Sequence, residues 1–132
     1  MSEHPNAALH RTAHDAFSRG DMDTLSKMIA EDTVWHICGN SPASGDFNGR
    51  EAVFGEFLAN LGELSSGAAK FVGSQDHLGD GEYSVSFFRF GATRNGRTAD
   101  FGVCEVIRWG NGRIAEEWFY LEDQYGWDEF WS

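Results

Sequence analysis

The second half of the chain alternates strand-like segments with glycine-rich turns, and this pattern restricts the possible folds most strongly. Four segments rich in aromatic and β-branched residues are separated by Gly79-Asp80-Gly81, Asn95-Gly96 and Gly110-Asn111-Gly112. Such turns are typical of tight hairpins, which join antiparallel neighbours. We therefore predict an antiparallel meander of four strands, over 70–78, 83–93, 98–109 and 113–121.

The first half of the chain predicts three helices and one short strand. Apolar residues recur three and four positions apart within 6–18, 22–29 and 50–61, so each segment presents one apolar face when helical. A short apolar segment, 33–37, precedes a loop rich in Gly, Asn, Ser and Pro. With 132 residues the chain is too short for two ordinary domains, so we predict a single α+β domain over 1–132.

The meander carries apolar side chains on both of its faces. Phe87 and Phe88 are neighbours in sequence and must point to opposite sides of a strand. A sheet that is apolar on both faces has to be covered on both. We expect helices on one face and a second copy of the chain on the other, as a homodimer through the sheet. The acidic and aromatic tail, 122–131, is expected to form a lid over a cavity mouth or a flap over a sheet edge.

Composition excludes several classes of partner. The formal net charge is −11, which repels nucleic acid backbones and anionic membrane surfaces. Aromatic residues make up 14% of the chain, enough both to close a core and to line a cavity. The two cysteines, Cys38 and Cys104, lie in strand-like surroundings and are interpreted as free thiols of a reducing compartment. Because no signal-peptide-like or membrane-spanning segment is evident, we expect a cytoplasmic protein.

His36 stands at the end of the expected strand 33–37. Side chains alternate along a strand, so if Val34 faces the interior, His36 does too, while Trp35 and Ile37 face the other way. Histidine is the side chain whose ordinary pKa lies nearest neutrality, which suits it to proton transfer in a pocket. A buried histidine that binds a carbonyl group, or an exposed one without a role, fits the same pattern.

Glu105 interrupts an otherwise apolar face formed by Phe101, Val103 and Ile107. If this face is interior, burial raises the pKa of the carboxyl group and suits it to proton transfer. The opposite face is equally apolar, so the residues alone leave open whether Glu105 is buried or exposed.

His10 and His14 are four residues apart on the first expected helix, a spacing that places both rings on one face and could bind a metal ion. No third ligand is evident, so we expect two solvated histidines and no metal site. The sequence contains no phosphate-binding loop, nucleophile elbow or metalloprotease motif, and the glycines at 110 and 112 belong to a hairpin turn.

Four segments together resemble the nuclear transport factor 2-like superfamily, in its SnoaL-like and ketosteroid-isomerase-like branch. They are Ser18-Arg19-Gly20-Asp21-Met22-Asp23, the strand that ends in Trp35-His36, the SPASG loop with Gly49-Arg50, and Gly112-Arg113-Ile114-Ala115-Glu116-Glu117-Trp118. The resemblance implies a cone-shaped α+β barrel, in which three N-terminal helices pack in a curved, mixed and mostly antiparallel sheet. It also implies a mostly apolar pocket and a homodimer.

The resemblance further implies a site. His36 falls at the position of the proton-shuttling aspartate of ketosteroid isomerases, and Glu105 at that of their protonated aspartic acid. This places Glu105 in the interior, with His36 and Glu105 as the catalytic pair. The expected substrate-binding residues are Val34, Phe54, Phe57, Phe88, Phe90, Phe101, Val103, Glu117 and Phe119.

Three functional hypotheses follow. The first is an enzyme that carries out acid/base chemistry on a small hydrophobic molecule without a cofactor or metal, as an isomerase, cyclase or dehydratase does. The second is a binding protein for hydrophobic or cationic small molecules without turnover. The third is a dimerisation module whose interior is filled by side chains. A fold of this kind does not by itself choose among them.

Overall fold

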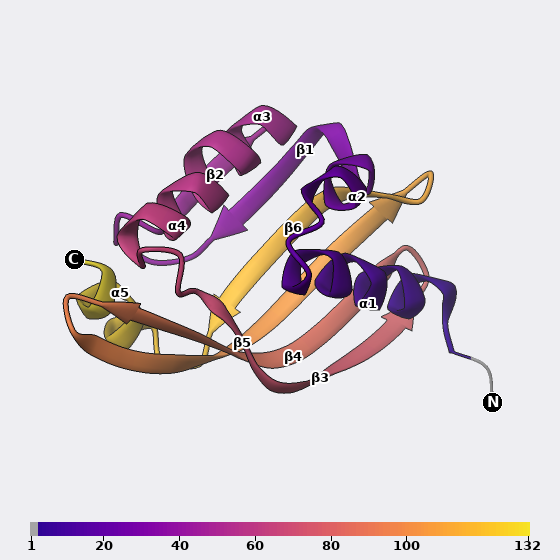
Figure 1. The fold of residues 1–132 in the computed structure, drawn as a ribbon. Coiled ribbons are helices and arrows are strands. Elements are labelled where there is room, and N and C mark those ends of the chain that lie inside the picture. Colours follow the sequence, from indigo (N-terminus) through magenta and orange to yellow (C-terminus); the bar gives the residue numbers. More distant parts are fainter. Residues whose placement is uncertain (1–2) are drawn as a thin grey trace.

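The computed structural model describes residues 3–132 and shows a curved six-stranded sheet that packs helices against one of its faces (Figure 1). The strand order is β2-β1-β6-β5-β4-β3, with β1 parallel to β6 and all other neighbours antiparallel. The strands are β1 (Ile29–Ile37), β2 (Gly45–Asn48), β3 (Lys70–Asp80), β4 (Tyr83–Arg94), β5 (Arg97–Gly110) and β6 (Arg113–Leu121). The predicted α+β cone with a mixed sheet is confirmed.

The N-terminal helices form where the apolar periodicity predicts them, except that the second ends at Lys27 and Ile29 already begins β1. Asp21 caps the second helix, because its carboxylate accepts a hydrogen bond from the backbone N–H of Thr24. The third helix is continuous, and its middle six residues have π-helical hydrogen bonding. The helices are α1 (Pro5–Ser18), α2 (Met22–Lys27), α3 (Arg50–Ala52), η1 (Val53–Leu58) and α4 (Ala59–Leu64). None of the helices within residues 3–132 is long and apolar enough to cross a membrane.

Strict alternation along the strands separates an inner face from an outer face. On β5 the odd-numbered residues from Phe101 to Trp109 are buried against the helices, whereas the even-numbered ones are less buried and lie on the outer face. On β1 the buried residues are Ile29, Thr33, Trp35 and Ile37. The inner face therefore carries the core, and any site enclosed by the helices must be built from this set.

The C-terminal tail forms a helix, α5 (Gln124–Trp131), that packs at one end of the sheet (Figure 1). Trp127 and Trp131 are fully buried, and Phe101 packs against the rings of Trp127 and Phe130. The tail is thus part of the hydrophobic core rather than a flap over an edge. A second difference from the sequence prediction is β2, which pairs with β1 from within the expected loop.

Candidate active site

A cavity of about 60 Å³ lies between the helices and the inner face of the sheet. Its wall is apolar and mostly aromatic, apart from the side chains of His14, Glu105 and Glu117. The other lining residues are Ala13, Phe17, Leu25, Trp35, Phe57, Leu58, Leu61, Phe71, Phe88, Phe90, Ile107, Ile114 and Phe119. Because burying an unpaired charged or polar group in apolar surroundings is costly, each of these three side chains needs a specific partner.

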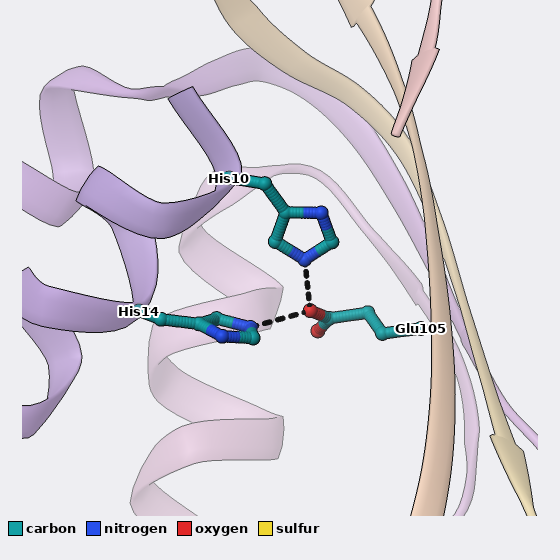
Figure 2. A group of neighbouring side chains, drawn as sticks. All are labelled: His10, His14 and Glu105. Atoms are coloured by element: carbon teal, nitrogen blue, oxygen red, sulfur yellow. Dashed lines mark hydrogen bonds and ion pairs between the residues drawn. The ribbon is translucent and has the colours of Figure 1, made fainter. Parts of the chain in front are cut away.

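Glu105 is at the centre of a buried histidine–carboxylate cluster, which we call the inner cluster: His10, His14 and Glu105 (Figure 2). The Nε2 atoms of His10 and His14 lie 2.6 Å and 2.7 Å from the same oxygen, Oε1 of Glu105. The three residues are between 0% and 7% exposed. Two ring nitrogens from helix α1 thus converge on one carboxylate oxygen from strand β5.

Local structure explains why these three side chains meet. His10 and His14 are one helical turn apart on α1, so both project from the same face of the helix. This face packs against the inner face of the sheet, where odd-numbered residues of β5 point, among them Glu105. The direct neighbours of Glu105 on the adjacent strands are Ser86 and Phe119.

A chain of hydrogen bonds fixes the tautomer of His10. The indole N–H of Trp109 donates to Oγ of Ser84 at 2.8 Å, and the same Oγ lies 2.7 Å from Nδ1 of His10. Burial lowers the pKa of His10, against the hydrogen bond and charge of Glu105, so the ring is neutral near pH 7. Since an ionised carboxylate can only accept, Nε2 of His10 carries the proton and donates to Glu105. Nδ1 then accepts from the Ser84 hydroxyl.

The two buried carboxyl groups have opposite protonation states. Burial acts to raise the pKa of Glu105, but the charge of His14 and the hydrogen bonds from His10 and His14 outweigh it and hold the pKa well below its usual range. Burial, reinforced by the negative charge of Glu105 and a hydrogen bond with it, holds the pKa of Glu117 well above its usual range. Near neutral pH, Glu105 is therefore ionised and Glu117 is protonated.

Further polar atoms near the cluster complete its surroundings. Nε2 of His77 lies 3.1 Å from Nδ1 of His14, and burial together with the charges of His14 and His10 lowers the pKa of His77 to about 4. Oε2 of Glu117 and Oγ of Ser86 are buried and have no hydrogen-bond partner within residues 3–132. A buried polar atom without a partner is costly, and a bound molecule can supply the missing bond.

The structure brings some of the residues expected at the site together. Glu105 lies in the cavity wall together with Glu117, and four of the expected aromatic residues line it as well. These four are Phe57, Phe88, Phe90 and Phe119. Phe101 and Val103 are on the inner face but outside the cavity, because α5 covers that end of the sheet. Phe54 is half-buried on η1 and does not reach the cavity wall.

The expected position of His36 in the cavity is wrong. His36 and Val34 lie on the outer face of β1, because burying the larger side chains of Trp35 and Ile37 turns the strand the other way. The His36 ring stacks on Trp118, with Nδ1 2.8 Å from Asp46 and Nε2 2.7 Å from Glu116. His36, Asp46 and Glu116 form what we call the outer cluster. His36 and Glu105 are therefore on opposite faces of the sheet.

The expectation that His10 and His14 are solvated is also wrong, since both are buried. The sequence carried a signal for this, because positions 7, 10, 13, 14 and 17 share one helical face and the other three are apolar residues, Ala7, Ala13 and Phe17. The third member of the cluster is 91 residues from His14 along the chain. Only the pairing of α1 with the sheet brings it into reach.

A curved mixed sheet that wraps around N-terminal helices and an apolar cavity is the architecture of the nuclear transport factor 2-like proteins. Within this class, residues 10–117 match the model of the SnoaL-like domain, and the chain belongs to the SnoaL-like family. An uncharacterized protein of Mycobacterium tuberculosis is 26% identical over the full length of both chains.

Solved structures share the fold. Bal32a, from a soil-derived mobile gene cassette, is 36% identical and superposes with a TM-score of 0.89 over 96% of each chain. IdmH of Streptomyces antibioticus, a candidate polyketide cyclase, shares the fold with a TM-score of 0.71 at 20% identity, over 90% of this chain and 93% of its own.

Proposed function

We propose that the protein is an enzyme that moves a proton on a small hydrophobic molecule without a cofactor, in an isomerisation, cyclisation or dehydration. The observation that carries this proposal is the pair of buried carboxyl groups in the cavity wall, with Glu105 ionised and Glu117 protonated. Two titratable groups whose surroundings drive their pKa values apart are a common arrangement for a base and an acid. Membership of the SnoaL-like family, and the fold shared with IdmH, support small-molecule chemistry of this kind.

The two carboxyl groups would have complementary roles. Oε1 of Glu105 is occupied by His10 and His14, which leaves Oε2 to accept a proton from a carbon next to a carbonyl group of the substrate. The O–H group of Glu117 would donate to the carbonyl oxygen as negative charge develops there. Oε2 of Glu117 has no hydrogen-bond partner within residues 3–132, so a proton on this oxygen would be free to donate to the arriving substrate.

The cavity wall indicates the class of substrate. It contains no Lys or Arg, and its histidine, His14, is already bound to Glu105, which leaves a carboxylate or phosphate without a cation to pair with. Its aromatic surfaces favour an uncharged, apolar and planar molecule. A cavity of about 60 Å³ is smaller than the ~150 Å³ that takes up benzene, so entry of a larger substrate requires side chains to move.

Solvent deuterium exchange tests the proposal without knowledge of the natural substrate. The protein is incubated in D₂O with a panel of apolar ketones and aromatic β-dicarbonyl compounds, and incorporation next to the carbonyl group is followed by NMR. Glu105→Gln should lower the exchange rate by about 10²–10⁴-fold, and Glu117→Gln by about 10²-fold. His36→Ala, on the outer face, is the matched control and should retain the rate.

The alternative is a binding protein that uses the same cavity. Its acidic wall without Lys or Arg suits neutral or cationic ligands. Tight binding of a panel compound with no exchange above the buffer rate would support this alternative and overturn the enzyme proposal. Equal exchange by the wild type and Glu105→Gln would show that the carboxylate is not the base.

A further inference from the structure

We propose that the inner cluster is a binding site for a divalent transition metal ion, with Zn²⁺ as the natural fit. The ligands would be Nε2 of His10, Nε2 of His14 and a carboxylate oxygen of Glu105, whose donor atoms all lie within 4.8 Å of one another (Figure 2). This site goes beyond the proposed function, because an ion held there would occupy the carboxylate that acts as the base.

The donor set suits zinc. Two imidazole nitrogens and one carboxylate oxygen are ligands that Zn²⁺ commonly uses, whereas Mg²⁺ and Ca²⁺ prefer oxygen ligands alone. The two histidines are supplied by one turn of α1, so the helix fixes their separation. The carboxylate comes from a different element, β5, which makes the site depend on the folded protein.

An ion requires the donor atoms of the inner cluster to adjust their separations. The N–H groups now lie at hydrogen-bond distances of 2.6 Å and 2.7 Å from Glu105. Ligand bonds of about 2.0–2.2 Å in a tetrahedral arrangement separate the donor atoms by about 3.3 Å. The carboxylate therefore has to withdraw by less than about 1 Å, which rotation about the side-chain bonds of Glu105 can provide. The two ring nitrogens, now within 4.8 Å of each other, have to reach the same separation of about 3.3 Å.

Both histidines already have the second partner that a ligating imidazole needs. A metal on Nε2 of His10 requires the ring proton to be on Nδ1, where it would donate to Ser84. The Ser84 oxygen has two lone pairs and would still accept from Trp109. Nδ1 of His14 faces Nε2 of His77 at 3.1 Å and would donate to it. These outer contacts orient both rings for an ion.

An open coordination position would face the cavity, since His14 and Glu105 belong to its wall. Three protein ligands and one exchangeable position are the pattern of zinc sites that accept a small ligand. Under the proposed function, Zn²⁺ would inhibit proton transfer by occupying Glu105. The binding itself requires no turnover and is measured separately.

Titration with Co²⁺ tests the site, because its visible absorption reports coordination number and needs no activity. The wild type should bind one Co²⁺ per chain with the intense band of four- or five-coordinate cobalt, and Zn²⁺ should displace it. In NMR spectra the ring signals of His10 and His14 should be broadened before that of His36. Binding weaker than millimolar, or broadening that begins at His36, would overturn the proposal.

Variants locate the ion. Glu105→Gln and His14→Ala should each weaken Co²⁺ binding by at least a hundredfold, and Ser84→Ala by about 10–100-fold through the loss of an outer partner. His36→Ala is the control, since it removes a histidine between two carboxylates but leaves the inner cluster intact. Circular dichroism checks that each variant is folded. Unchanged affinity in folded Glu105→Gln and His14→Ala would place the ion elsewhere and refute the site.

Discussion

The same sheet carries a histidine–carboxylate cluster on each face, and the two clusters have opposite properties. In the inner cluster the histidines are buried, and burial lowers the pKa of His10. In the outer cluster the His36 side chain is 32% exposed. Partial burial there lowers its pKa too, but the hydrogen bonds with Glu116 and Asp46 outweigh it and raise the pKa. Solvent access, rather than residue type, therefore decides which cluster contains a neutral ring beside an ionised acid.

Removal of the carboxylate from each cluster should give the largest contrast. Glu105→Ala leaves two buried ring N–H groups without an acceptor, and we expect it to lower the free energy of unfolding by about 3–5 kcal/mol. Glu116→Ala removes a partly exposed partner of His36 and should cost less than about 1 kcal/mol. Urea unfolding measures both.

Glu105→Gln refines this comparison, because its amide oxygen can still accept from both histidines. It should cost clearly less than Glu105→Ala. If the Ala variants at both positions cost the same, burial does not separate the two clusters as we argue.

The two faces of the sheet also differ in what covers them. Helices cover the inner face, whereas Phe87 and Tyr120 are each 49% exposed on the outer face and flank Cys104 on neighbouring strands. We propose that a second copy of the chain covers this row. Phe87→Glu should then convert a dimer into a monomer in light scattering coupled to size exclusion. Tyr125→Glu, at an exposed aromatic residue of α5, should leave the dimer intact. A monomeric wild type would refute the proposal.

The sequence predicts the elements of this fold well because their signals are local. Glycine turns and alternating apolar residues locate β3 to β6, and helical periodicity locates α1 and the helix from Arg50 to Leu64. The strand β2 is missed because only four residues, Gly45–Asn48, form it, and it exists through its pairing with β1. The sequence shows that the tail is aromatic, but its burial depends on packing of α5 against one end of the sheet, which is not a local signal.

The site is predicted only in part, because it depends on contacts between distant segments. Glu105 is placed in the interior by the family resemblance, and Glu117 follows from the same register. His36 is misplaced because Val34 and Trp35 are both apolar, and their order does not say which one faces inward. The outer partners of His36, Asp46 and Glu116, are 10 and 80 residues away. His10 and His14 require the docking of α1 on the sheet.

Acid should destabilise the protein through the inner face. The unfolded chain binds a proton at His77 near pH 6.5, whereas the folded protein does so only when its pKa of about 4 is reached. Stability should therefore fall as the pH decreases from 6.5 to about 4. For a fully buried ring the loss in the free energy of unfolding would be about 3.4 kcal/mol. Because the His77 ring is only half-buried, we expect about 2 kcal/mol.

The difference between the wild type and His77→Gln in urea unfolding at pH 7 and pH 4.5 isolates this contribution from that of the acidic residues. The variant should lose less stability than the wild type between these two pH values. Equal losses would mean that His77 does not resist protonation in the folded protein.

The outer cluster should show the opposite and smallest dependence on pH. The folded-state pKa of His36 is raised, so its ion pairs with Glu116 and Asp46 stabilise the protein fully below pH 6.5. This contribution is lost as the pH rises through the raised pKa. His36→Asn should thus lower the free energy of unfolding by up to about 1 kcal/mol at pH 5.5 and by less at pH 9. Salt at about 0.5 M screens surface charges and should reduce this loss. A cost that is equal or greater at pH 9 would show that packing on Trp118, rather than charge, holds His36 in place.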